Sequence, residues 1–280
     1  MTAIPAPDTR VGRDGALALG FERRGGRTVL AACRSILPLQ VLAPVALDDP
    51  AAIVSLLNPT GGVLGGDRLV TDVTLGPGAH ACVTTPSATR IYRSAGEPAV
   101  QRMCARLGAG AILEWVPDHA IPSAGAMLRQ SFDVEIGDGA RLILVDAFAA
   151  GRIARGEAWR FSLLDSALTI RDERGLLLHD RFALRGDEGW ARLGLAEGRP
   201  YFASIVLIAE AGLETFIAGL PGALPARLAG AVGAARLSRR GALLRCLAAD
   251  APSLCATLEA VWTLARAHLL GLPRLALRKL

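Results

Sequence analysis

The sequence predicts a mainly β protein: a β-helical or solenoid-like stack of strands over residues 1–211, with a small α-helical region over residues 212–280 packed on it. Two observations carry this prediction. Three segments of the pattern apolar–GxGA–apolar repeat along the first part of the chain, and each follows a stretch of alternating apolar and polar residues. From about residue 212 onward, apolar residues recur every three or four positions, which is the helical period.

The repeated segments read LGPGAHACV, LGAGAILEW and IGDGARLIL. Their first glycines, Gly76, Gly108 and Gly137, lie 32 and 29 residues apart. The stretches before them, LVTDVTL, RMCARL and SFDVEI, alternate as half-buried strands do. Each unit therefore predicts strand, turn, strand, with a period typical of stacked folds. The pattern leaves open whether the stack is a β-helix or a two-sheet sandwich.

Two glycine pairs stand close together in NPTGGVLGGDRL, residues 58–69. A phosphate loop requires GxxxxGK[ST] and a dinucleotide fingerprint requires GxGxxG, and this segment has neither pattern. The carboxylate of Asp67 would also repel a phosphate. Glycine is favoured where the backbone takes positive φ or passes close to another segment. We therefore expect a tight corner between strands, with Asp67 capping backbone N–H groups or facing a polar channel.

The C-terminal region predicts two helices. The longer begins at the capping residue Asp250, has Pro252 in its first turn, and ends at Gly271 before Pro273. A shorter one is expected over residues 225–237, although its glycines weaken it. We interpret the apolar stripe of the longer helix as core rather than as a cofactor site. The stripe consists of Leu254, Leu258, Val261, Trp262, Ala265 and Leu269.

Composition argues against several classes of function. The pI is about 9.3, and Lys279 is the only lysine among 31 basic residues. Most arginines alternate with acidic and apolar residues, so no basic stripe suited to nucleic acid is expected. The five cysteines are scattered without CxxC spacing, which disfavours a disulfide framework and a zinc site. With no signal peptide and no apolar run of roughly twenty residues, we expect a cytoplasmic protein without membrane contact.

Catalytic motifs such as HExxH and GxSxG are missing from the sequence. The best polar constellation combines carboxylates with arginines and a tyrosine, and structural ion pairing is the interpretation we favour for it. Its members are Asp67, Arg90, Tyr92, Arg93, Glu114, Arg152 and Glu157. A hydrolase on a β-scaffold and a β-repeat binding module remain as alternative classes.

Four segments in order, NPTGGVLGGDRL, VTTPSATRIYRSAG, GAILEWVPDHAIPSAGA and GRIARGEAW, resemble the urease accessory protein UreD family, also called UreH. The resemblance extends from RRGGRTVL near residue 23, through PLQVLAP, to LLGLPR at residues 269–274. It departs from the family at Ser123, where an aromatic residue is common, and at Asp118, where Gln or Glu is frequent. The motif residues it covers are Gly61, Gly62, Gly65, Gly66, Arg90, Tyr92, Arg93, Trp115, Arg152 and Gly156.

The resemblance implies a β-helical chaperone of urease maturation that is not an enzyme. It implies that the protein binds apo-urease and the accessory protein UreF, which recruits the nickel-carrying GTPase UreG. Nickel would be cargo in transit, and no tightly bound cofactor is implied.

A protein that passes nickel on must hold it weakly, because a closed site of several His or Cys ligands would trap the ion. We therefore hypothesise that Asp67, Glu114 and Glu157 lie along a water-filled passage. The alternative is that they brace the stack by pairing with Arg90, Arg93 and Arg152.

Overall fold

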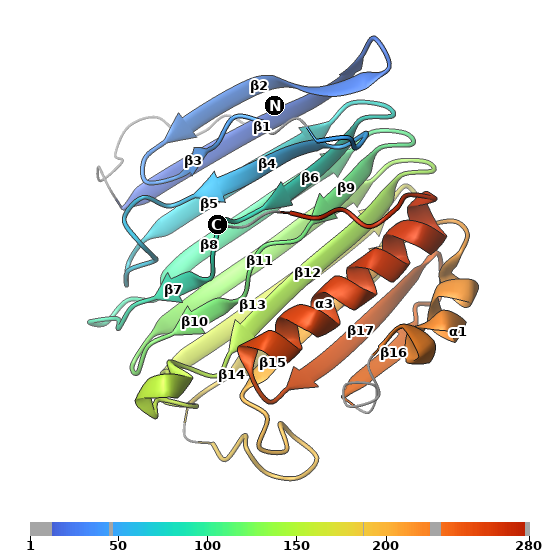
Figure 1. The fold of residues 1–280 in the computed structure, drawn as a ribbon. Helices are drawn as coiled ribbons and strands as arrows, with labels where there is room; N and C mark the ends of the chain where they lie inside the picture. The colour runs from blue at the N-terminus through green and yellow to red at the C-terminus, as the bar shows by residue number, and fades with distance from the viewer. Residues whose placement is uncertain (1–12, 45–46, 187, 225–230, 278–280) are drawn as a thin grey trace.

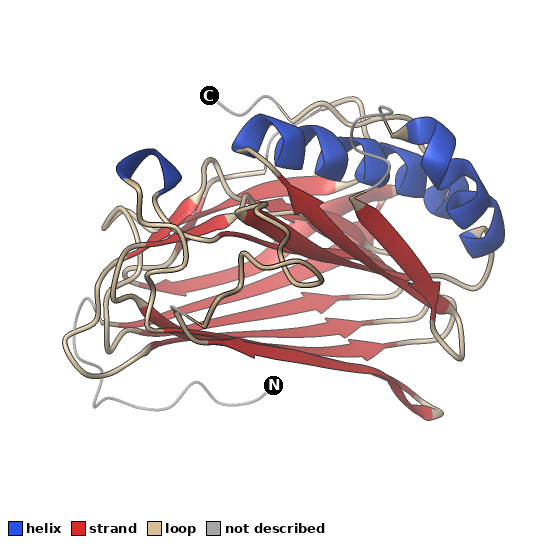
Figure 2. Cartoon of the chain, turned by 90° about the horizontal axis from the view of Figure 1, so that it is seen from below, coloured by secondary structure: helices blue, strands red, loops and turns tan. Residues whose placement is uncertain are grey.

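The computed structural model of the chain describes residues 13–44, 47–186, 188–224 and 231–277. Two β-sheets face each other, and a layer of helices covers the outer side of one of them (Figures 1 and 2). The predicted class, a solenoid-like stack of strands with a small helical C-terminal region, is confirmed. Among the described residues, no helix is long and apolar enough to cross a bilayer.

The first sheet has seven strands and is parallel through its centre. Strands β1, β5, β8, β11 and β13 run parallel to one another, while β2 and β14 pair antiparallel at the two edges. In spatial order the strands are β14 (Gly175–Leu184), β13 (Leu163–Asp172), β11 (Met127–Ile136), β8 (Ala99–Leu107), β5 (Arg68–Leu75), β1 (Asp14–Arg24) and β2 (Arg27–Ile36).

The second sheet has ten strands, and short strands extend it at one end. The spatial order is β16 (Val232–Arg236), β17 (Gly241–Ala248), β15 (Tyr201–Ile208), β12 (Arg141–Ala149), β9 (Ile112–Trp115), β6 (His80–Thr84), β4 (Ala52–Leu57) and β3 (Gln40–Val41). Strand β10 (Ala120–Pro122) pairs with β12 and with β7 (Thr89–Ile91).

The chain alternates between the two sheets, and the predicted GxGA turns make the crossings in one direction. They join β5 to β6, β8 to β9 and β11 to β12, and the second glycine of each lies at left-handed φ of 61–65°. Longer segments, residues 58–67, 85–98, 116–126 and 150–162, return to the seven-stranded sheet at the opposite end of the strands. We call this end of the stack, defined by those four segments, the loop end.

Two apolar cores hold the layers together. One fills the space between the sheets, and the other lies between the ten-stranded sheet and the helices α1 (Leu213–Ala223) and α3 (Ala251–Ala265). The apolar stripe of α3 packs into this second core, and Asp250 caps the helix by accepting a 2.7 Å hydrogen bond from Ser253 N–H. A π-helical turn, η2 (Arg266–Leu270), ends it at Gly271.

The prediction of a helix over residues 225–237 is wrong for its described part. Residues 225–230 lie outside the described residues, whereas Val232–Arg236 form β16, hydrogen-bonded to β17. The glycine at position 233 and the exposed sheet edge favour extended backbone here, because edge pairing satisfies groups that a glycine-containing helix holds poorly. Helix α1 lies earlier in the chain, and β16 and β17 extend the ten-stranded sheet.

Candidate functional site

The loop end gathers most of the motif residues that the sequence singles out. Val63 donates a 2.8 Å hydrogen bond to the carbonyl of Arg90, and Tyr92 N–H donates one of 2.8 Å back to Val63. The hydroxyl of Tyr92 donates to the carbonyl of Gly61 at 3.3 Å. A Cβ on Gly62 would lie 2.5 Å from the Arg90 carbonyl oxygen, so this corner has no room for a side chain. The prediction of a crowded backbone corner is confirmed.

Asp67 closes the same corner as a cap. Its Oδ2 accepts a 2.8 Å hydrogen bond from Leu64 N–H, and the residue is only 2% exposed. Its Oδ1 finds no hydrogen-bond donor among the described residues. Burial raises the pKa of Asp67, and the hydrogen bond from Leu64 and the charge of Arg13 oppose that shift. Of the two roles the sequence left open for Asp67, the structure shows capping.

The neighbouring loop segments of the loop end are also closely packed. Gly65 and Gly125 face Ser94 and Arg93, respectively, at distances that would crowd any added side chain. The next rung holds Glu157, whose oxygens accept from Arg152 at 2.7 and 2.5 Å.

Glu157 also accepts a 3.0 Å bond from Ala124 N–H. The Arg152 hydrogen bond is the main reason that the pKa of Glu157 falls to about 2. Gly156 lies beside the pair, at the left-handed C-cap of the short helix η1 (Ile153–Arg155). The predicted bracing is therefore present for this one pair.

Glu114 lies elsewhere, on the side of the ten-stranded sheet that faces α3. It is fully buried and accepts from His80 at 2.7 Å, Trp262 at 2.6 Å and Arg266 at 2.5 Å. Burial works to raise the pKa of Glu114, but the hydrogen bond from His80 and the charge of Arg266 outweigh it and hold the pKa below its usual value. Arg266 also bonds Asp49 and the Pro273 carbonyl, which completes a closed network.

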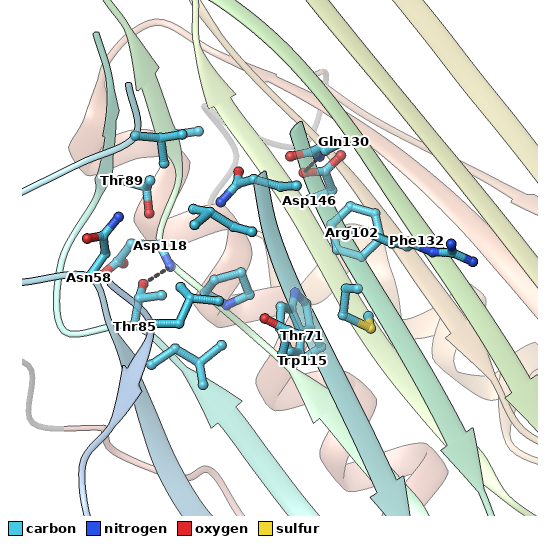
Figure 3. Close-up of a pocket in the computed structure, with 18 of the residues that line it drawn as sticks. Asn58, Thr71, Thr85, Thr89, Arg102, Trp115, Asp118, Gln130, Phe132 and Asp146 are labelled. Carbon is cyan, nitrogen blue, oxygen red and sulfur yellow. Dashed lines mark hydrogen bonds between the residues drawn. The ribbon is translucent and has the colours of Figure 1, made fainter. Parts of the chain in front are cut away.

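A cavity of about 160 Å³, with a wall of both apolar and polar side chains, lies between the two sheets and reaches toward the loop end (Figure 3). This volume has room for several water molecules. Apolar side chains, including Trp115 and Phe132 in edge-to-face contact, form part of its wall. The indole N–H of Trp115 is buried without an acceptor among the described groups. The polar side chains of the wall include Asn58, Thr71, Thr85, Thr89, Gln101, Asp118, Gln130 and Asp146.

Asp146 is the carboxylate at the inner part of this cavity. Its Oδ1 accepts from Gln130 Nε2 and its Oδ2 accepts from Ser166 Oγ, both at 2.8 Å. These partners come from the opposite sheet, so the carboxylate bridges β12 to β11 and β13. Burial raises the pKa of Asp146 to about 6, although both hydrogen bonds and Arg245 oppose the shift. Near neutral pH this carboxylate is thus poised close to its titration point.

Polar side chains continue from Asp146 toward the edge of the sheets formed by β14 and β17. A second cavity, of about 10 Å³, lies next to Asp146. Its wall includes Asp146 and its partner Ser166, together with Asp180 and Ser204. Arg245 bonds both Ser204 and Asp180, the latter at 2.6 Å, and its side chain is 46% exposed. Polar groups therefore reach from the loop end, past Asp146, to the surface between β14 and β17.

The structure separates the three carboxylates that the sequence placed along a passage. Asp67 and Glu157 lie at the loop end and Glu114 lies under α3, and none of them is among the residues that line either cavity. Arg90 and Arg93 form no ion pair with them among the described residues.

Sequence reasoning missed Asp146 and Arg266. Asp146 is the one charge in the apolar run LILVDAFAA, and Arg266 stands four residues after Trp262 on the apolar stripe. A charge in a buried pattern was the available signal for both.

The described residues contain no group of three or more His, Cys, Asp or Glu side chains placed to hold a metal ion. The cavity wall offers single carboxylates, amides and hydroxyls. Oxygen donors of this kind suit hard, hydrated cations and bind Ni²⁺ more loosely than imidazole or thiolate sets do. The arrangement could accept a hydrated dication in passage rather than keep it.

Comparison with known proteins gives consistent results. The family model described as UreD urease accessory protein matches residues 13–279. The urease accessory protein UreD of Delftia acidovorans is 36% identical over 97% of this chain and 94% of its own length. That of Alkalilimnicola ehrlichii is 36% identical over 97% and 93%. The Klebsiella aerogenes protein of the same name is 31% identical over 96% and 98%.

Proposed function

The chain belongs to the UreD urease accessory protein family, and from this premise we propose that it is a non-catalytic chaperone that assists nickel delivery to urease. In this proposal it binds apo-urease and UreF, and UreG joins through UreF. It works in the cytoplasm and takes no part in binding nucleic acid or membranes. Nickel is its cargo, with no resident cofactor.

The observation that carries the nickel part of the proposal is the cavity between the sheets, whose wall is partly polar. Its wall combines the carboxylates Asp118 and Asp146 with neutral hydroxyl and amide groups, and polar side chains lead from it to the surface at both ends. A dication that leaves water needs compensating oxygen dipoles and at least one negative charge along its route. Asp146 supplies that charge midway.

Weak coordination supports transfer rather than storage. Both oxygens of Asp146 already accept hydrogen bonds from Gln130 and Ser166, so an arriving ion shares their charge with two donors and gains less net binding than at a bare carboxylate. A partly protonated carboxylate weakens the site further, since the proton competes with the metal. The role of Asp67, Glu114 and Glu157 in nickel passage stays a prediction.

A direct experiment separates this function from its alternatives. Apo-urease genes are co-expressed with nickel in the medium, with and without this chain, alongside the UreF and UreG partners. We expect active urease only when the chain is present. A hydrolase would instead turn over a panel of esters and amides, and a β-repeat binding module would bind a partner without any effect on urease activity.

A further inference from the structure

The loop end carries four exposed arginines that the proposed passage does not use. Arg90, Arg93, Arg155 and Arg160 are all exposed. In the described part of the chain, none of the four lies within ion-pair distance of a carboxylate. Arg155 acts on Glu157 only through its more distant charge. We call these four residues the loop-end arginine surface.

Backbone pairing places these arginines on neighbouring rungs of the stack. The Arg90 carbonyl accepts from Val63, and Arg93 forms a β-bridge with Ala126. The side chain of Arg93 lies against Gly125, whose N–H donates to the Arg160 carbonyl at 2.8 Å. Neighbouring rungs of a sheet are about 4.8 Å apart. The backbones of Arg90, Arg93 and Arg160 therefore lie on adjacent segments of the loop end, with Arg155 on the adjoining turn η1.

The carboxylates of the loop end neutralise this surface only in part, because exposed Glu97 and half-buried Asp118 supply two negative charges against its four arginines. Glu157 is already engaged by Arg152 and Ala124, and Asp67 is buried as a cap. Like charges held close together on a fixed scaffold repel one another in the free protein. Guanidinium groups bind carboxylates in a planar, two-pronged geometry, so the complement to this surface is a cluster of Asp and Glu side chains on another molecule.

The position of the surface relative to the cavity indicates which partner it meets. Val63 and Thr89 line the cavity, and both adjoin Arg90. A positive surface here repels a dication that approaches from solvent, so this end is unsuited to nickel entry. It is suited to nickel exit once carboxylates from the receiving protein have neutralised the arginines.

We propose that the loop-end arginine surface docks an acidic face of apo-urease and thereby opens the loop end of the cavity toward it. The inference rests on the proposed function, because that function identifies apo-urease as the receiver of nickel. Docking and passage are coupled: the carboxylates that hold the complex together also remove the electrostatic barrier at the exit.

The test measures binding of purified apo-urease to the full chain. One variant combines Arg90→Glu with Arg160→Glu, and the matched control combines Arg23→Glu with Arg27→Glu, which are exposed at the far hairpin and change the charge equally. We expect the loop-end variant to lose at least about tenfold in affinity at low salt, because like charges across an interface are strongly unfavourable. The control should stay within about threefold. Higher salt should weaken wild-type binding and leave the variant little changed.

Circular dichroism and thermal melting check that both variants fold, and Arg90→Gln with Arg160→Gln gives a milder loss in the same direction. Equal binding by wild type and the loop-end variant, with urease still activated by wild type, would overturn the docking surface alone. Equal weakening by the control would show that only net charge matters, which also overturns it. If wild type neither binds nor activates apo-urease, the proposed function fails as well.

Discussion

Trp262 donates a 2.6 Å hydrogen bond from its indole N–H to Glu114, a residue 148 positions earlier in the chain. Both side chains lie in the layer between α3 and the ten-stranded sheet. Arg266, one helical turn after Trp262, donates to the other oxygen of the same carboxylate at 2.5 Å. The C-terminal helix is thus fixed to strand β9 by directional, charged bonds in addition to apolar packing.

Removing the Glu114 carboxylate should destabilise the protein strongly. In Glu114→Ala the fully buried Arg266 loses one of its two carboxylate partners, and breaking a buried ion pair in this way typically costs about 3–5 kcal/mol. Denaturant unfolding measures the change. Glu135→Ala is the matched control, since the Glu135 side chain is 70% exposed in its pair with Arg106. A loss for Glu114→Ala no larger than for the control would contradict a bracing role.

Trp262→Ala should lower the free energy of unfolding by about 3–5 kcal/mol, because it empties a core position and removes the hydrogen bond to Glu114 Oε2. Trp262→Phe keeps most of the apolar volume but loses the hydrogen bond, so it should cost less. The melting temperature of each variant is compared with its recovery in a pull-down that uses the UreF-like partner as bait. An unchanged melt with weakened pull-down would show that this face binds a partner instead.

The local patterns of the sequence predicted the stack well. The GxGA turns, the glycine corner and the caps of α3 are short-range features, and each depends on residues within a few positions of one another. The network around Glu114 joins segments far apart in the chain, so spacing alone could not identify its partners. Strand β16 was missed because its Ala- and Gly-containing sequence has no alternation, and pairing with β17 decides its structure.

The surroundings of the three carboxylates proposed for a passage could not be predicted, for a similar reason. Asp67, Glu114 and Glu157 stand beside glycines or in apolar stretches, and this context marks burial without showing what surrounds a side chain. Two of them turned out to hold arginines. Asp146 faces the cavity because β12 alternates between the inter-sheet space and the helix layer, and that alternation is known only once both layers are placed.

Gly62→Val should destabilise the loop end by several kcal/mol. The new Cβ would lie 2.5 Å from the Arg90 carbonyl oxygen and 2.7 Å from the Tyr92 ring, and the φ of 156° disfavours a β-branched residue. The matched control is Gly96→Val, also at positive φ but with no atom near the added Cβ. If the two variants unfold at the same denaturant concentration, close approach is not what glycine provides at position 62.

Asp146 should make stability depend on pH near neutrality. Its folded pKa, about 6, is above the ordinary 3.8, so the native state binds a proton more tightly than the unfolded chain. The stabilisation is therefore complete below about pH 3.8 and is lost as pH rises through about 6. Asp146→Asn lacks this titration. The difference in unfolding free energy between wild type and variant should shift by at most about 3 kcal/mol, in favour of the variant, between pH 4 and pH 8. A pH-independent difference would contradict the raised pKa.

Nickel binding by the isolated chain should be weak, with a dissociation constant in the micromolar range or above, because its described residues offer dispersed oxygen donors rather than a cluster of His or Cys.

Asp146→Ala should reduce urease activation while leaving the complex with apo-urease intact, since the carboxylate lies between the sheets and away from the exposed surface of the loop end. Alanine at Asp67, Glu114 or Glu157 tests the passage predicted from the sequence in the same assay. For Glu114 the activity must be corrected for the amount of folded chain. Cys82→Ala is the control, as a buried thiol outside both cavities. The readout is urease activity per assembled complex. Normal activation by Asp146→Ala would place the route of nickel outside the cavity, and normal activation by the other three would leave them as caps and braces of the stack.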